Sequence, residues 1–344
     1  MIDLTGRRIA IVGGAGFIGH NLALDLAKRG AKVDIVDSLQ VNNLLWFESR
    51  PEAAHRELLM AILNQRLDLI RAAGIPMHPQ DARDYHALSR VLATINPQVI
   101  VHLAAVSHAG RSNKDPYSTF DHSLRTLENS LDFARGAGVE QFIFLSSSMA
   151  YGNFKQAEVT EDHPLDPIGI YGALKVAGEK MVIAYQQVFG LPYTIIRPSA
   201  LYGQRCVSRR VSQIFIESAL TGKPIHVDGD GSDKLDFTHI EDLVNGMVLA
   251  IQHPAAVNQI FNLTYGAGRP IRELIEMVVE AFPSTTVEFG ARDALMPVRG
   301  TLSIAKAREL IGFTPVNPIE IGFRKYIDWY RQLAGDTPGL FKRS

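Results

Sequence analysis

Cysteine is nearly absent from this sequence, since Cys206 is the only one in 344 residues. A single cysteine excludes an internal disulfide and a cysteine-built metal site, and it fits a reducing compartment. No metal site is expected. An excess of charge is missing as well, because 35 Lys and Arg stand against 36 Asp and Glu, giving a formal net charge of -1. Nucleic acid and membrane surfaces are therefore not expected as main partners.

Long hydrophobic runs are also lacking. The first residues lead into a short apolar run that ends in glycines, without a signal-peptide core or a stretch of membrane-spanning length. We therefore expect a cytoplasmic protein. Apolar residues make up 46% of the chain, which is enough for a large core in about two domains, or in one domain with a lobe.

The clearest pattern lies near the N-terminus. A β-branched run at residues 8–12 is followed by a turn with Gly13, Gly16 and Gly19, and then by a helical pattern. Strand, glycine turn and helix is the order of a dinucleotide-binding unit, in which the helix N-terminus attracts a pyrophosphate.

A second strand, at residues 31–36, ends at Asp37. A carboxylate about 20 residues after such a turn can hydrogen-bond an adenosine ribose. It repels a 2′-phosphate, and no arginine stands beside it in the sequence. NAD is therefore expected as the cofactor in preference to NADP.

Strands and helices continue to alternate after this unit. Strand-like runs and helical patterns follow in turn, at residues 75–78, 98–103, 116–134, 141–145, 171–188 and 192–197. This order predicts an α/β fold with a Rossmann-type doubly wound parallel sheet. We expect an NAD-binding domain over residues 1–197.

One segment inside this domain departs from the alternation. Residues 41–74 carry apolar side chains at helical spacing, from Leu58 to Ile70. We expect an inserted helix or helix pair here. An elaborated crossover or an oligomer contact explains it better than a substrate lid.

Beyond Arg197 the alternation loosens and polar and basic residues gather. A smaller C-terminal substrate-binding lobe is therefore expected over residues 198–235 and 266–344. Part of residues 236–265 is expected to return to the sheet domain.

Ligand sites in open parallel sheets gather beyond the C-terminal ends of the strands. The residues found at these ends are Asp81, Ala82, Leu103, Ala104, Ala105, Ser107, Ser146, Ser147 and Ser148. We expect Asp81 to contact the adenine and the three serines to lie near the nicotinamide. Asp84 should cap the next helix, and His102, at the end of a buried strand, is expected to be structural.

Tyr171 and Lys175 are the candidate reaction centre. Four positions apart on a helix, they share a face and can point at one bound molecule. A nearby ammonium favours the phenolate form of a tyrosine, so the pair is suited to proton transfer at neutral pH. Alone this spacing is weak evidence, because it also arises by chance on solvated helices.

Taken together, these residues resemble the extended short-chain dehydrogenase/reductase family, specifically its nucleotide-sugar epimerases and dehydratases of the UDP-glucose 4-epimerase type. The resemblance covers nearly the whole chain. It rests on the glycine turn, Asp37, Asp81, residues 102–105, Ser146–Ser148, Tyr151-Gly152, Tyr171 with Lys175, Arg197-Pro198, residues 236–243 and residues 306–315.

The resemblance implies roles for further residues. Ser147 would orient the sugar 4-hydroxyl, Tyr171 would take its proton, and Lys175 would hold the nicotinamide ribose while hydride passes from C4 to NAD. The implied cofactor contacts are Gly13, Gly16, Phe17, Ile18, Gly19, Asp37, Asp81, Ala82, Leu103, Ala104, Ala105, Tyr171, Lys175 and Pro198. A nucleotide sugar is the implied substrate.

Two positions narrow the reaction. Relatives that dehydrate or decarboxylate the sugar carry acidic residues where this chain has Ser148 and Met149. C4 epimerisation is therefore the leading prediction, because it needs no further acid or base. A 4-ketosugar reductase or another carbonyl oxidoreductase and a sugar-nucleotide dehydratase remain alternatives, and a non-catalytic nucleotide-binding protein is disfavoured by Ser147, Tyr171 and Lys175 together.

Two expected diphosphate contacts are missing, because Ala200 and Leu235 replace the usual Asn and Arg. Other arginines can bind phosphate in a bidentate manner. The candidate substrate residues are Ser107, Ser147, Ser148, Met149, Arg205, Arg209, Arg292 and Arg299, and Arg210 and Lys234 could add charge. The resemblance also implies a homodimer that pairs through the helices at residues 116–134 and 171–188.

Overall fold

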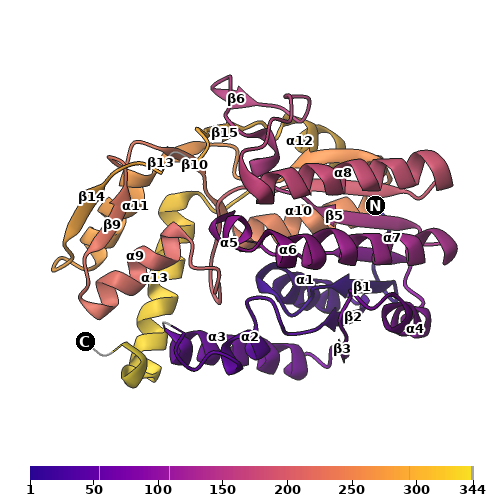
Figure 1. Ribbon diagram of the computed structural model, residues 1–344, viewed down its shortest axis with the longest axis horizontal. Helices are drawn as coiled ribbons and strands as arrows, with labels where there is room; N and C mark the ends of the chain where they lie inside the picture. Colours follow the sequence, from indigo (N-terminus) through magenta and orange to yellow (C-terminus); the bar gives the residue numbers. More distant parts are fainter. Residues whose placement is uncertain (54, 108, 294, 342–344) are drawn as a thin grey trace.

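The computed structural model describes residues 1–53, 55–107, 109–293 and 295–341, so residue 294 and residues 342–344 of the expected lobe lie outside the described residues. A seven-stranded sheet forms its centre (Figure 1). Every pairing in it is parallel. The strands in spatial order are β12 (Gln259–Asn262), β7 (Tyr193–Arg197), β5 (Gln141–Leu145), β4 (Val99–His102), β1 (Arg8–Val12), β2 (Lys32–Asp37) and β3 (Met77–Pro79). The predicted α/β fold with a doubly wound parallel sheet is confirmed.

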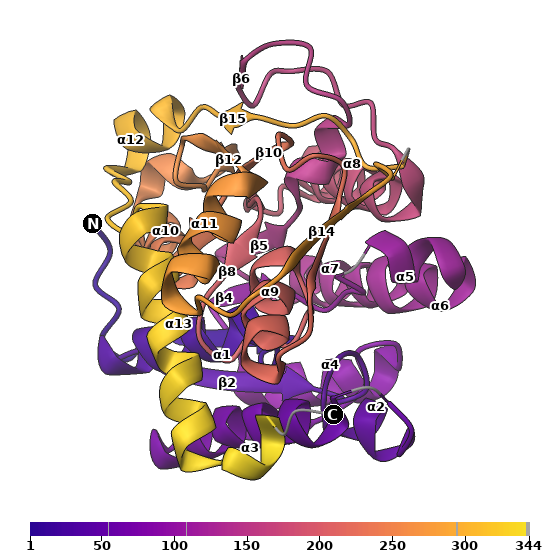
Figure 2. The same cartoon turned by 90° about the vertical axis from the view of Figure 1, so that its left-hand side faces the viewer.

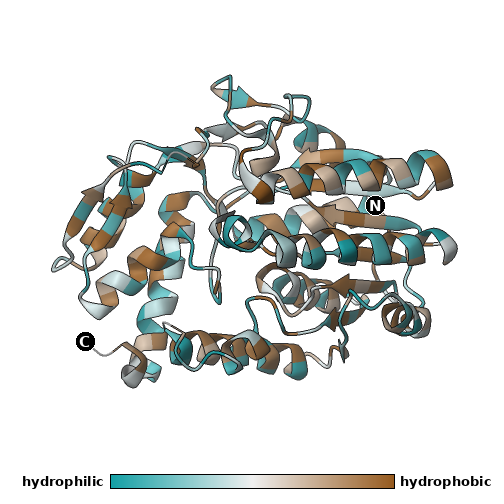
Figure 3. Cartoon of the chain, in the orientation of Figure 1, coloured by the Kyte–Doolittle hydropathy of each residue, from teal (hydrophilic) through white to brown (hydrophobic). Residues whose placement is uncertain are grey.

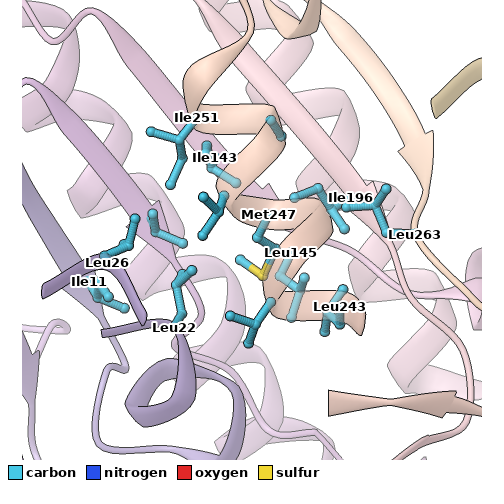
Figure 4. Close-up of a cluster of buried hydrophobic side chains, with 14 of the residues drawn as sticks. Ile11, Leu22, Leu26, Ile143, Leu145, Ile196, Leu243, Met247, Ile251 and Leu263 are labelled. Atoms are coloured by element: carbon cyan, nitrogen blue, oxygen red, sulfur yellow. The ribbon is translucent and has the colours of Figure 1, made fainter. Parts of the chain in front are cut away.

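Side chains of each strand alternate between two hydrophobic layers. In β1, Ile9 and Ile11 enter one layer, whereas Ala10 and Val12 enter the other. The helices α1 (Phe17–Lys28), α10 (Ile240–Gln252) and α12 (Ala305–Ile311) contribute to the first layer, and α4 (Tyr85–Ile95), α7 (Thr126–Gly136) and α8 (Gly169–Phe189) to the second. Figure 4 shows Leu22, Leu26 and Met247 packed against the strands in the first layer. Asp84 caps α4 as predicted, with its side chain accepting a hydrogen bond from Ala87 N at 2.9 Å.

The helix expected at residues 116–134 is not a uniform α-helix. It consists of α6 (Pro116–Phe120), a π-helical turn (Asp121–Arg125) and α7, and the short α5 (Ala109–Lys114) precedes it. π-Helical turns are rare in proteins overall, but those that occur are often found at functional sites. The prediction of a helix is correct in extent, but the hydrophobic spacing carried no sign of the wider turn.

A second group of elements lies beside the sheet, to its left in Figure 1 and in front of it in Figure 2. Its helices are α9 (Val211–Thr221), α11 (Ile271–Ala281) and α13 (Ile319–Asp336). Short strand pairs join them: β8 (Leu201–Tyr202) with β11 (Thr238–His239), β9 (Ile225–Asp228) with β14 (Val287–Gly290), β10 (Lys234–Asp236) with β13 (Gly268–Pro270), and β6 (Glu158–Val159) with β15 (Thr301–Leu302). Short 3₁₀ turns span Ser148–Tyr151, Pro254–Ala256 and Pro338–Phe341. None of the helices in the described part of the chain combines the length and apolar character needed to cross a membrane.

The insertion at residues 41–74 forms α2 (Leu44–Glu48) and α3 (Arg56–Ala72). In Figures 1 and 2, α3 lies beside the C-terminal end of α13. Hydrophobic and hydrophilic segments succeed one another along it (Figure 3). Leu59 and Ile62 are buried in one cluster with Phe215 of α9 and Tyr326 of α13. The inserted helix α3 is thus part of the same hydrophobic core as α9 and α13.

Candidate active site

An open cavity lies beyond the C-terminal ends of β1, β2 and β4. Eleven of the expected cofactor residues line it: Gly13, Gly16, Phe17, Ile18, Gly19, Asp37, Asp81, Ala82, Leu103, Ala104 and Ala105. Ser107 lines it too. Val207, Ser208 and Arg210 contribute from the other side, in the segment that leads into α9. Tyr171, Lys175 and Pro198 are not among the lining residues.

The glycine turn brings backbone close to the end of β4. Gly13 has φ +84°, and a Cβ there would lie 2.6 Å from Ala104 N, so a side chain cannot be accommodated. Gly16 is the N-cap of α1 and supplies no side-chain hydrogen bond, and no acidic residue occupies the first turn. The free N–H groups of that turn therefore face no internal acceptor and suit a pyrophosphate.

Asp37 closes β2 with both carboxylate oxygens in use. Oδ2 accepts from Ala15 N at 2.9 Å and Oδ1 from Leu39 N at 2.7 Å. Burial raises the pKa of Asp37, while the two N–H groups and the charge of Arg66 act against that rise. No arginine stands beside Asp37 in the sequence, but the fold brings Arg66 of α3 near enough for its charge to act on Asp37.

Tyr171 and Lys175 lie on the first turns of α8, and both are buried. The Lys175 Nζ is 5.8 Å from the centre of the Tyr171 ring and donates a hydrogen bond to Leu145 O at 2.7 Å. Burial lowers the pKa of Lys175, and Tyr171 and Glu179 oppose the change. An ammonium has three N–H donors, so two remain for a ligand.

Ser147 lies next to this helix, at the end of β5. Its Oγ accepts from Met149 N at 3.2 Å, at the start of the 3₁₀ turn. A Cβ at Gly172 would lie 2.6 Å from Met149 O, so only glycine lets α8 approach this turn so closely. The packing of Gly172 on Met149 therefore brings the Tyr171 end of α8 against the segment that carries Ser147 and Ser148.

Two ionisable groups near Tyr171 and Lys175, namely Glu179 and His102, are held by hydrogen bonds within the protein. Glu179 accepts from Ser146 Oγ at 2.5 Å and pairs with Arg197 at 2.8 Å (Nε) and 2.6 Å (Nη2), so both of its oxygens are occupied. His102 hydrogen-bonds Ser130 Oγ through Nδ1 at 3.1 Å. Burial lowers the pKa of His102 to about 3, and the charge of Lys175 acts in the same direction.

The arginines expected at the substrate fall into two groups. Three have partners within the protein: Arg205 Nε donates to His20 Nε2 at 3.3 Å, Arg209 pairs with Glu217 at 2.6 Å, and Arg292 pairs with Asp233 at 2.9 Å. Arg299 differs, because its buried Nε has no hydrogen-bond partner among the described residues.

The positive charge of Arg210 acts on the guanidinium of Arg299. Burial lowers the pKa of Arg299 to about 10, and the charge of Arg210 is the next contribution in the same direction. Arg210 Nη2 donates to the carbonyl of Ser107 at 3.2 Å. Two guanidinium groups held near each other, one with an unused donor, form a surrounding suited to an anion.

Arg66, His122 and Arg210 also line the cavity. Arg66 and His122 were not predicted as site residues, and Arg210 was expected only to add charge near the substrate. Arg66 could have been recognised, because it is four residues from both Ile62 and Ile70 on the apolar face of α3. His122 could not, since it lies in the π-helical turn. The described residues contain no group of three or more His, Cys, Asp or Glu side chains placed to hold a metal ion.

The nucleotide cavity, the tyrosine–lysine pair and the doubly wound sheet define an NAD-dependent enzyme. The chain belongs to the NAD dependent epimerase/dehydratase family, whose model matches residues 9–264. A UDP-glucose 4-epimerase of Mycolicibacterium smegmatis is 30% identical over 331 residues, covering 94% of this chain and 98% of the relative.

Solved structures agree with this classification. The UDP-glucose 4-epimerase of Thermotoga maritima, solved with UDP-glucose, is similar with a TM-score of 0.83 and 25% identity, over 94% of this chain and 99% of that one. The UDP-glucose 4-epimerase of Thermus thermophilus, solved with NAD, has a TM-score of 0.80 and 27% identity over the same shares of the two chains. NAD is the cofactor, and the free N–H groups of α1 together with Asp37 fit it.

Proposed function

We propose that the protein is an NAD-dependent epimerase that inverts C4 of a nucleoside-diphosphate sugar through a transient 4-ketosugar. The observation that carries this proposal is the packing of the segment with Ser147 and Met149 against the Tyr171 end of α8. In this segment the neutral Ser148 and Met149 stand where the other reactions of the family need a carboxylate. Glu179 cannot replace that carboxylate, because its oxygens are bound by Arg197 and Ser146. Proton transfer at the 4-hydroxyl is then the chemistry that these side chains support.

The roles follow from the positions. Tyr171 as phenolate accepts the proton of the 4-hydroxyl, and Ser147 Oγ holds that hydroxyl through a hydrogen bond. Lys175 places a positive charge beside the phenolate and has two free donors for a ribose hydroxyl. When bound, NAD accepts the hydride from C4 and returns it to the opposite face. Tyr171 then gives its proton back to the 4-oxygen, so no net oxidation occurs.

Arg210 and Arg299 support a diphosphate substrate. Leu235, which stands where an arginine is common, is buried in the cluster around α9 and α13 and offers no charge. Arg210 at the cavity wall and the unpartnered Nε of Arg299 can take over that role. We therefore assign these two arginines to the diphosphate. Arg209 and Arg292, which already have carboxylate partners, are not assigned to it.

A net oxidoreductase, such as a 4-ketosugar reductase, is the second candidate, because Ala200 and Leu235 also suit a substrate without a diphosphate. One experiment separates the two. The purified protein is incubated with UDP-, GDP-, CDP- and dTDP-sugars, anomeric signals are followed by NMR, and absorbance of the reduced cofactor is recorded in parallel.

An epimerase converts a sugar to its C4 epimer and back without a lasting change in that absorbance. Stoichiometric consumption of added NADH with a ketone would replace the proposal by the reductase. Accumulation of a 4-keto-6-deoxy sugar would replace it by a dehydratase.

A further inference from the structure

Arg66, on the inserted helix α3, is an unusual side chain for the interior of a protein. Its exposed fraction is 1%, and no carboxylate among the described residues forms an ion pair with it. Burial lowers its pKa to about 10. Burying an arginine without a paired charge is costly, so its hydrogen bonds must offset that cost. The neighbours of Arg66 therefore show what it does.

The guanidinium of Arg66 holds a peptide of the opposite side of the cavity. Nε donates to the carbonyl oxygen of Arg205 at 2.9 Å, and Nη2 donates to the same oxygen. Arg205 has φ +64°, a left-handed conformation that is unfavourable for a residue with a side chain. The two donated hydrogen bonds compensate for this strain. They fix the start of the segment 205–210, which supplies Val207, Ser208 and Arg210 to the cavity wall.

The side chain of Arg205 leads back to the glycine turn. Its Nε donates to His20 Nε2 at 3.3 Å, and His20 Nδ1 donates to Gly16 O at 2.9 Å. Burial lowers the pKa of His20 well below its usual range, and Arg66 and Arg205 act in the same direction. A neutral imidazole has one donor and one acceptor, and this arrangement uses both. The segment 205–210 is thus tied to the glycine turn at Gly16 and to the inserted helix at Arg66.

We propose that Arg66 and His20 are positioning residues that tie the segment 205–210 to the NAD site, so that NAD binding and ordering of this segment reinforce each other. Arg66 lines the same cavity as Gly16 and Asp37, and its charge acts on Asp37. The proposal rests on NAD as cofactor and not on the reaction that follows. It also gives the insertion at residues 41–74 a function. Its helix α3 carries Arg66, whose positive charge acts on Asp37 and whose guanidinium binds the peptide of Arg205.

The test compares Arg66→Met, Arg66→Lys and Arg205→Met with the control Arg71→Met. Arg71 lies on the same helix and pairs with Asp68 on the surface. Each protein is freed of NAD, its Kd for NAD is measured by calorimetry, and amide hydrogen exchange is recorded with and without saturating NAD. We expect Arg66→Met to weaken NAD binding by about tenfold, and Arg66→Lys, which keeps the charge but loses the two-pronged donor, by less.

The exchange data separate positioning from general stability. In the wild type and in Arg71→Met, NAD should slow exchange in residues 205–210. In Arg66→Met and Arg205→Met this effect of NAD should be lost at saturation, while exchange in β1 and β5 stays as in the wild type. The proposal is overturned if Arg66→Met binds NAD with a Kd within twofold of the wild type. It is also overturned if NAD still protects residues 205–210 in both Arg66→Met and Arg205→Met. If Arg66→Met does not fold, Arg205→Met decides, because it leaves the buried Arg66 in place.

Discussion

Of the two ionisable groups considered near Tyr171, Lys175 is free to assist a proton transfer at the tyrosine hydroxyl and Glu179 is not. Lys175 beside it is 7% exposed and keeps two donors free, whereas Glu179 is bound by Arg197 and Ser146. A buried cation stabilises a nearby anion far more than an exposed one does, because water no longer screens it. The mechanism proposed above therefore assigns the proton exchange with the substrate to the hydroxyl of Tyr171.

Replacing Tyr171 by Phe tests this role. The substitution removes the hydroxyl and keeps the ring, so NAD binding and folding should persist while kcat falls by about 10²- to 10⁴-fold. Turnover is measured by NMR on the active sugar and NAD binding by calorimetry. Tyr185→Phe, which removes a hydroxyl from the same helix α8, should leave kcat within about twofold. Full activity in Tyr171→Phe would contradict the mechanism.

His102 makes stability depend on pH. Its pKa in the folded protein is about 3, against an ordinary value of 6.5. Between these values the unfolded chain binds a proton that the folded protein does not, so the free energy of unfolding falls as pH falls below 6.5. The difference between wild type and His102→Gln isolates this contribution. In urea unfolding, that difference should shrink by about 1.4 kcal/mol per pH unit below the ordinary pKa, and a constant difference from pH 7.5 to 5 would refute it.

At the scale of elements, hydrophobic periodicity was sufficient to predict six of the seven strands of the sheet, and β12 was expected only as part of residues 236–265 that return to the sheet domain. The runs at β1, β4 and β5 are apolar on both faces, which is typical of buried parallel strands, and all three occur where the sequence predicts them. The lobe was less predictable. Its strands, such as β8 and β11, are two residues long, and they form because the chain is brought together by tertiary packing and not because of local propensity.

The site was predictable where it lies on regular elements and less so elsewhere. The glycine turn, Asp37 and residues Leu103–Ala105 line the cavity as expected, because each directly follows a strand. The arginines depend on loop geometry, which sequence spacing does not encode. The left-handed backbone at Arg205 and Arg209 directs these two side chains to His20 and Glu217, leaving Arg210 at the cavity.

At the scale of the molecule, the cavity is built by two parts of the chain. The sheet supplies the glycine turn and Asp37, while the segment before α9 supplies Val207, Ser208 and Arg210. The shared core around α3, α9 and α13 holds the two parts together. A substrate bound between them can contact both the cofactor and the arginines, and this suits a reaction in which a ketosugar must stay bound while it turns.

The molecule also leaves apolar side chains exposed on α6 and α8. Tyr117 (86% exposed) and Phe120 (49%) lie on α6, and Val188 (71%) and Phe189 (51%) end α8. In Figure 1 these helices run side by side on the near face of the molecule. Covering such side chains is favourable, and stable dimers bury about 800 Å² on each partner. We therefore expect a homodimer that pairs through α6, α7 and α8.

Sedimentation velocity tests this expectation with matched variants. The wild type should sediment as a particle of twice the chain mass of 37.9 kDa. Phe120→Asp places a charge in the expected interface and should shift the protein to monomers, because an unpaired carboxylate is costly to bury. Phe289→Asp, at an equally apolar and exposed position on β14, should remain dimeric. A monomeric wild type, or a dimer that tolerates Phe120→Asp but not Phe289→Asp, would place the interface elsewhere or remove it.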